Sequence, residues 1–179
     1  MKKKLLAILV CAASVTMLFA LTACGANLDR EVTIQDMTLS VPSNWAEEPN
    51  ESNTDNKGSV WFEDIDEDKD ENDFDAIYVS YQKVNTSDTS TAKQAIEAKR
   101  EKYESDFGIT NWDIADETEQ VIDGAKVTIY EYSFEKAIDN VTQKYEYKIA
   151  YVYAPSMHYT IQVYGDAASV NDVINSIEL

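Results

Sequence analysis

Apolar residues recur at every second position in several segments of the chain, which is the period of a β-strand with one buried face. Met37, Leu39 and Val41 alternate with polar residues, and Pro42 ends that segment. Further segments with strand character, one of them rich in tyrosine, are 58–63, 76–84, 144–153 and 158–165. The polar stretch 47–57 has no apolar period, so we expect a loop there.

Turn residues between these segments predict that successive strands are antiparallel. Asp123-Gly124 lies between two strand-like runs and suits a type I′ hairpin turn, which needs positive φ at both central residues. The second arm is expected to reach Phe134, and a turn around 138–140 leads into the tyrosine-rich strand. Pro155-Ser156 then turns the chain into the strand 158–165. Short turns of this kind favour a mainly antiparallel sheet.

A helix is predicted over 91–106. Thr91 and Gln94 have the spacing of a capping box, and Gly108 stands where a helix C-cap is expected. Apolar residues at spacings of seven and eleven form one narrow stripe, which should lie on the sheet: Ile96, Tyr103 and Phe107.

A second amphipathic helix is predicted at the end of the chain, with Ser169 as its N-cap three residues before Asp172. Its apolar positions are Val170, Val173, Ile174 and Ile177. No internal repeat or second apolar block is visible, so the chain is expected to have one domain, 31–179. The fold class expected is α+β: a mainly antiparallel sheet with helices packed against it.

The chain begins with three lysines and an apolar run from Leu5 to Leu21, which is the layout of a secretory signal. The run ends in Leu-Thr-Ala-Cys at positions 21–24, which resembles the lipobox of bacterial lipoproteins. This resemblance implies a signal peptide over 1–23, acyl chains on Cys24, and a short tether over 24–30. The alternative is an uncleaved membrane anchor, because Leu5 to Ala23 is just long enough to span a bilayer.

Charge and cysteine content limit the classes of function. The formal net charge is −18, and removal of residues 1–23 takes away three lysines and no acid, which makes it −21. We expect no nucleic-acid partner, because that needs a basic surface. Cys11 lies in the apolar run and Cys24 is the expected lipid site, so no thiol remains for a disulfide, a nucleophile or a metal.

The order of elements resembles the PsbP-like family, named for an extrinsic protein of photosystem II. The resemblance is carried by Val41-Pro42-Ser43-Asn44-Trp45 and by the closing strand pair and helix that end in Ser-Ile-Glu-Leu, 176–179. It implies an α/β/α sandwich with an antiparallel sheet. Photosynthetic members of that family are non-enzymatic accessory proteins that influence calcium and chloride retention. No metal-binding motif of the family matches residues of this chain.

Tyrosine occupies alternate positions in the segment 144–153, so four rings share one face of the predicted strand: Tyr145, Tyr147, Tyr151 and Tyr153. The other face begins with Lys144, Glu146 and Lys148 and turns apolar at Ala150 and Val152. Aromatic residues are enriched in strands, which favours packing of this stripe in the core. Contact with a ligand at its more exposed end is the alternative.

The acidic run 64–75 allows two interpretations. In a calcium loop its carboxylates would take positions 1, 3, 5, 7 and 12, filled by Asp64, Asp66, Asp68, Asp70 and Asp75. Lys69 stands where the turn needs glycine, and Asp75 replaces the bidentate glutamate. A solvated acidic loop is therefore favoured over a site for weakly bound Ca²⁺, and no other cofactor is expected.

The sequence offers no catalytic residue to single out. His158 is the one histidine, and its place at a strand start favours an exposed or capping role. We therefore expect a binding or accessory module, lipid-anchored on the extracytoplasmic face of the cell membrane, that contacts an envelope protein, a peptide or a small ligand. The alternative is a hydrolase of the cell envelope that uses two carboxylates about 5–10 Å apart in a deep pocket.

Overall fold

The structure is a computed structural model that describes residues 27–64, 75–84, 90–139, 141–165 and 168–179. Its main feature is a seven-stranded sheet in which every pair of neighbouring strands is antiparallel. In spatial order the strands are β3 (Ala46–Pro49), β4 (Lys57–Glu63), β5 (Ala76–Lys83), β9 (Met157–Tyr164), β8 (Val141–Tyr153), β7 (Ala125–Ile138) and β6 (Thr110–Ile122).

One face of the sheet is covered by a separate hairpin and a short helix. The hairpin pairs β1 (Arg30–Ile34) with β2 (Met37–Val41), and the helix is α2 (Val170–Asn175). Thr38 and Glu178 exchange two backbone hydrogen bonds of 2.8 and 2.9 Å, which fix the end of the chain to β2. The core between these elements and the sheet is apolar and includes Met37, Leu39, Phe62, Ile77, Val152, Ile161 and Ile174.

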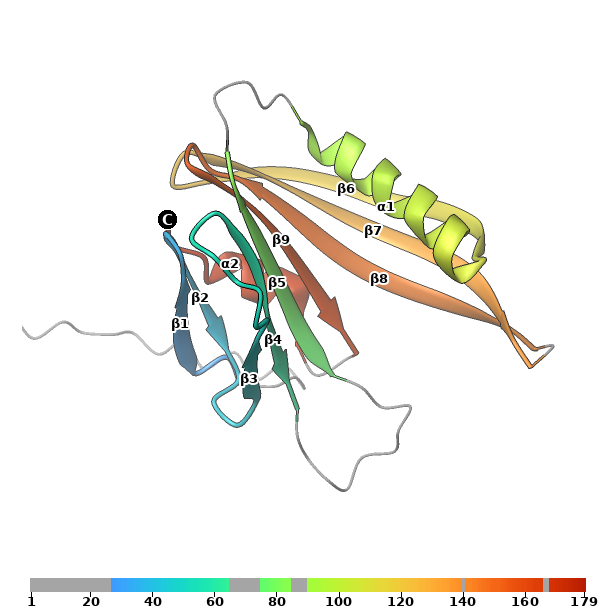
Figure 1. Cartoon of the computed structure of the whole chain (residues 1–179), viewed down its shortest axis with the longest axis horizontal. Coiled ribbons are helices and arrows are strands. Elements are labelled where there is room, and N and C mark those ends of the chain that lie inside the picture. Colours follow the sequence, from blue (N-terminus) through green and yellow to red (C-terminus); the bar gives the residue numbers. More distant parts are fainter. Residues whose placement is uncertain (1–26, 65–74, 85–89, 140, 166–167) are drawn as a thin grey trace, which may run out of the picture.

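Helix α1 (Ala92–Phe107) lies on the opposite face, along the half of the sheet that contains β7 and β8 (Figure 1). The two helices therefore lie on opposite faces, and the chain has the α+β sandwich expected from its sequence. The interface under α1 is an aromatic layer supplied mostly by the sheet, which we define as Trp61, Tyr78, Tyr103, Trp112, Tyr130, Tyr132, Phe134, Tyr145, Tyr147, Tyr151, Tyr153 and Tyr164.

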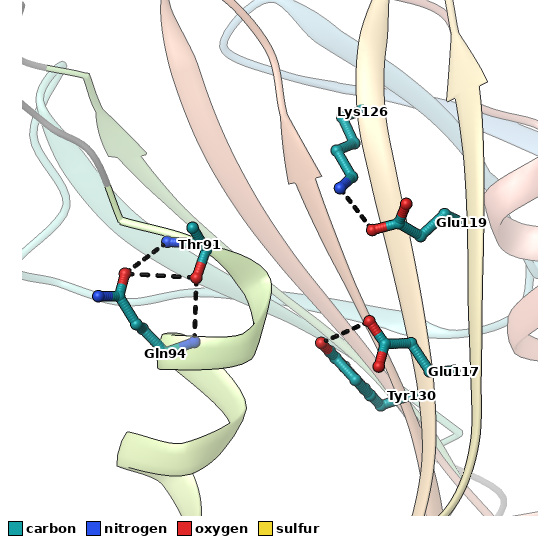
Figure 2. A network of polar contacts seen from close by, with 6 residues as sticks. All are labelled: Thr91, Gln94, Glu117, Glu119, Lys126 and Tyr130. Atoms are coloured by element: carbon teal, nitrogen blue, oxygen red, sulfur yellow. Dashed lines mark hydrogen bonds and ion pairs between the residues drawn. The ribbon is translucent and has the colours of Figure 1, made fainter.

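The ends of α1 have the predicted caps. The Thr91 hydroxyl accepts a hydrogen bond from the Gln94 backbone N–H, and the Thr91 N–H donates to the Gln94 side chain, as Figure 2 shows. Gly108 has φ of 63°, the left-handed conformation that ends many helices. Beside this N-terminus, the Tyr130 hydroxyl donates to Glu117 at 3.1 Å, which links β7 to β6 (Figure 2).

Some local predictions were wrong. Strand β1 was not predicted, because charged residues obscure its alternation of more and less exposed positions. The alternation is apparent once β1 is paired with β2. Strand β3 occupies the start of the predicted loop 47–57. Ser169 stands at the N-cap position of α2, but its side chain makes no cap hydrogen bond, and that helix is held by burial of its apolar face. Phe107 is 51% exposed, because its ring lies at the end of α1, edge-on to Tyr103.

The centre of α1 is joined to the sheet by a polar chain. The Lys99 amine donates to the side-chain oxygen of Gln162 on β9 at 2.8 Å, and the Gln162 amide donates to the Tyr132 hydroxyl at 3.1 Å. The Lys99 amine also lies 4.5 Å from the centre of the Tyr103 ring, a cation–π distance. Burial lowers the pKa of Lys99 to about 8, and the nearby Lys102 charge adds to this effect.

The tyrosine stripe is predicted to stabilise the fold most where it is buried. Tyr151 is 5% exposed, so Tyr151→Ala should lower the free energy of unfolding by about 3–5 kcal/mol. Tyr145→Ala is the matched control on the same strand; its ring is only partly buried, so the loss should be clearly smaller. Denaturant unfolding measures both. A Tyr151→Ala protein as stable as the wild type would show that the stripe does not support the core.

Lys99 is predicted to make stability depend on pH in one window. Between pH 8 and 10.5 the unfolded chain binds the Lys99 proton more strongly than the folded chain does. The contribution of Lys99 to the free energy of unfolding therefore rises with pH over that window, by at most about 3 kcal/mol. Lys99→Met should remove this rise. The raised pKa values of the buried tyrosines affect both proteins alike, so the difference in unfolding free energy between them isolates Lys99. If the difference in unfolding free energy between the two proteins does not change with pH, the lowered pKa of Lys99 is contradicted.

Candidate functional site

A polar hollow of about 440 Å³ opens on the face of the sheet that carries α1, beside the N-terminal half of that helix. Its lining comes from β4, β5, β9 and β8, from the loop after β3, and from Ser90 and Ala95 at the helix. This volume falls within the usual range for small-ligand pockets. It combines space with tyrosine rings and uncharged polar side chains.

The floor of the hollow is a row of small hydroxyl residues on three neighbouring strands. Ser59 on β4 is paired with Ser80 on β5, and Ser80 is paired with Thr160 on β9. In the neighbouring row on the same face, two residues away along each strand, the paired residues are large: Trp61, Tyr78 and Gln162. The hollow exists because short side chains replace large ones in this one row.

Tyrosines from two strands form the sides of the hollow. Tyr151 on β8 is paired with Thr160, so it continues the floor row toward α1. Tyr153 lies edge-on to His158, with 4.2 Å between the ring centres. Burial raises the pKa of the Tyr151 hydroxyl, with the nearby Tyr153 adding to the rise, so this group stays protonated at neutral pH. On the far side of the floor, Tyr78 supplies a third ring.

The loop after β3 closes the outer edge of the hollow. Strand β3 ends at Pro49. Beyond that point the Asn53 side chain forms hydrogen bonds with the backbone of β4. Its oxygen accepts from the Ser59 N–H and its amide donates to the Ser59 carbonyl, both at 2.8 Å. A Cβ at Gly58 would lie 2.4 Å from both the Asn53 side-chain oxygen and the Tyr81 hydroxyl, so this close approach requires glycine. The rim is therefore held in place by contacts within the protein.

The charge of the hollow differs from that of the whole chain. Among the described residues that line it, Lys57 and His158 are the ionisable groups other than tyrosine, and none is acidic. The chain as a whole has 33 acidic residues and a net charge of −18. The described lining of the hollow is therefore uncharged to weakly basic, on a strongly acidic protein.

A second hollow of about 530 Å³ lies on the other face, beside α2, and does contain carboxylates. Lys144 contacts Glu146 at 2.6 Å, and Lys148 forms an ion pair with Glu131. The Lys144 hydrogen bond holds the pKa of Glu146 below its usual value. A general acid needs a raised carboxyl pKa, so Glu146 is poorly suited to that role.

The structure separates the four tyrosines singled out in the sequence. Tyr151 and Tyr153 line the polar hollow. Between this pair and the pair Tyr145 and Tyr147, the tyrosine stripe runs under α1. Tyr145 and Tyr147 line a smaller hollow of about 240 Å³ at the C-terminal end of the helix, together with Phe107. The stripe therefore packs along its middle and reaches a hollow at each end.

The other predicted site residues lie at or beyond the limits of the described chain. Cys24 and three carboxylates of the acidic run, Asp66, Asp68 and Asp70, are outside the described residues. Asp64 and Asp75 close that run, and the Asp64 N–H donates to the Asp75 carbonyl at 3.1 Å. Within the described ranges no three His, Cys, Asp or Glu side chains gather as a metal site, and no helix is long and apolar enough to cross a membrane.

Sequence reasoning missed the floor and the rim of the hollow. Ser59, Ser80 and Thr160 stand at ordinary positions in their own strands, and they form a row only through strand pairing. One signal was available, because a serine in a strand otherwise filled with large residues, such as Ser59 before Trp61, leaves space on that face. Asn53 had no signal, since its role depends on where β3 ends.

No protein-family model matches the chain, and no curated protein is similar to it in sequence. Among solved structures, the chain is similar to the cyanobacterial PsbP protein (CyanoP) of Synechocystis sp. PCC 6803. The similarity covers 84% of this chain and 91% of that one, with a TM-score of 0.60 and 11% sequence identity. Identity this low supports the fold alone. The chain therefore has a PsbP-like fold.

Proposed function

We propose that the chain is a non-enzymatic binding module, tethered through acyl chains on Cys24 to the extracytoplasmic face of the cell membrane, and that the polar hollow beside α1 is its binding site. The anchor part rests on the sequence, in which a charged start and an apolar run lead to Leu-Thr-Ala-Cys. Two or more acyl chains hold a protein stably to a membrane, whereas one does so only marginally.

The observation that carries the binding role is the composition of the hollow. Serine, asparagine and tyrosine dominate its lining. Antibody binding surfaces use the same residues, because tyrosine offers a large rigid contact area and serine and asparagine offer adaptable hydrogen bonds. The Asn53 bridge to Ser59 fixes the rim, so little conformational entropy is lost when a ligand binds.

Hydrolysis by carboxylates is the less favoured function. It requires two acids on either side of the reacting bond. The described lining of the polar hollow supplies none, and lysines pair with Glu131 and Glu146 in the second hollow. These features favour recognition of a ligand over its cleavage.

The anchor is tested by Cys24→Ser in the full chain. Without the thiol no acyl chain can be attached, so we expect the protein in the medium or as an unprocessed precursor. Fractionation of cells and the mass of the protein measure this. A Cys24→Ser protein that is processed and stays in the membrane as the wild type does would contradict lipid anchoring.

The binding role is tested by photocrosslinking in cells. A photoreactive benzoylphenylalanine at position 82 replaces Gln82, an exposed residue of the hollow's lining, and the control carries it at Glu31, an exposed residue of β1. We expect an adduct of defined mass from position 82 and not from position 31. The same products from both positions, or none from position 82, would contradict a ligand in the hollow.

A further inference from the structure

We infer that the polar hollow binds an uncharged polyhydroxylated ligand, such as a sugar ring. This inference rests on the proposed binding function and names the class of ligand for the same site.

The floor offers hydroxyl groups that are not used inside the protein. The side-chain hydroxyls of Ser59, Ser80 and Thr160 make no hydrogen bond with any residue that the structure describes, and the same holds for the Tyr151 hydroxyl in the same row. A hydroxyl both donates and accepts hydrogen bonds. A row of them therefore matches a ligand whose own groups also donate and accept, which is the property of a polyol. A carboxylate only accepts and an ammonium only donates.

The sides of the hollow suit the carbon face of a ring. Tyr78 and Tyr153 lie on opposite sides of the hydroxyl floor, and both rings are partly exposed. Tyrosine presents an apolar ring face together with a polar tip. A pyranose has C–H groups on its faces and hydroxyls around its edge, so its edge would meet the floor while its faces meet the tyrosines.

The charge of the protein argues against an ionic ligand. A net charge of −18 creates a negative field that repels an anion over distances of about 10 Å or more at low salt. The same field attracts cations, but the described lining contains no carboxylate to pair with one. Lys57 and His158 lie in the next row outward, paired through Gln82, beyond the hydroxyl floor. An uncharged ligand is not repelled by the negative field and needs no carboxylate to pair with.

The backbone around the hollow argues against an extended peptide. Peptides that add to a sheet need an open edge with free N–H and C=O groups. Here the floor strands β4, β5, β9 and β8 are paired with one another, and Asn53 occupies the edge groups of Ser59. What remains for recognition is side chains, and these are mostly hydroxyls, amides and rings.

The test is an NMR titration of the ¹⁵N-labelled lipid-free protein, from residue 25 onward, with the methyl glycosides of glucose, galactose, mannose and N-acetylglucosamine. Acetate, sulfate and a soluble Gly-Ser peptide are the comparison probes. We expect at least one glycoside to shift the amide signals of β5 and β9 around Ser80 and Thr160, and the comparison probes to leave them unchanged.

Variants then test the floor. Thr160→Val removes one hydroxyl at nearly constant shape and should weaken glycoside binding about 2- to 12-fold, the range for one hydrogen bond. Thr160→Ser keeps the hydroxyl and should bind nearly as the wild type does. Thr142→Val is the matched control, because Thr142 is exposed on β8 outside the hollow. Melting temperatures confirm that each variant is folded.

The inference is overturned if no glycoside shifts the hollow, if Thr160→Val binds as tightly as wild type, or if acetate, sulfate or the peptide binds there more tightly than any glycoside. In those cases a specific crosslink from position 82 would leave the binding function standing with a ligand of another class. Failure of both experiments would remove both proposals.

Discussion

The fold depends on how a polar helix is held against a sheet. Helix α1 buries only Ala92 and Ile96 fully, so it contributes little apolar surface of its own. The sheet supplies the missing contact through the aromatic layer, in which Trp112 stacks on Tyr132 at 4.6 Å and Tyr147 meets Tyr164 at 5.6 Å. Aromatic pairs add stability beyond the area that they bury. At the centre of this layer, Gln162 satisfies both of its polar groups through Lys99 and Tyr132, so the layer also fixes where the helix lies.

The polar hollow follows from the same arrangement. Large side chains fill the neighbouring row on this face of the sheet, and the row of Ser59, Ser80 and Thr160 leaves space open beside the helix. The rim at Asn53 and Gly58 is fixed by its own contacts, while the tyrosine sides are fixed because they are part of the packed layer. A site built on strands and a packed core keeps its geometry better than a site on a free loop. In the proposed binding role, the residues that stabilise the fold at this end of the tyrosine stripe would also contact the ligand.

Local patterns in the sequence predicted β2, β4, β5, β8 and β9, the hairpin at Asp123-Gly124 and the caps of α1, because each depends on residues close together in the chain. The faces of β2 and β8 were also predicted, since a period of two decides which side chains are buried. The position of β9 between β5 and β8 could not be predicted from such patterns, because α1 and three long strands separate β5 from β9 in the sequence. The hydroxyl row depends on that position. The candidate site was therefore found only in part, through Tyr151 and Tyr153.

The most direct test of this account is the measurement of nuclear Overhauser effects between a bound methyl glycoside and the protein in solution. Contacts from the C–H protons of the sugar to the ring protons of Tyr78 and Tyr153 are predicted, because these rings flank the hydroxyl floor. Contacts instead to Tyr145 and Phe107, at the other end of α1, or to the charged hollow around Glu131 and Lys148 would contradict it.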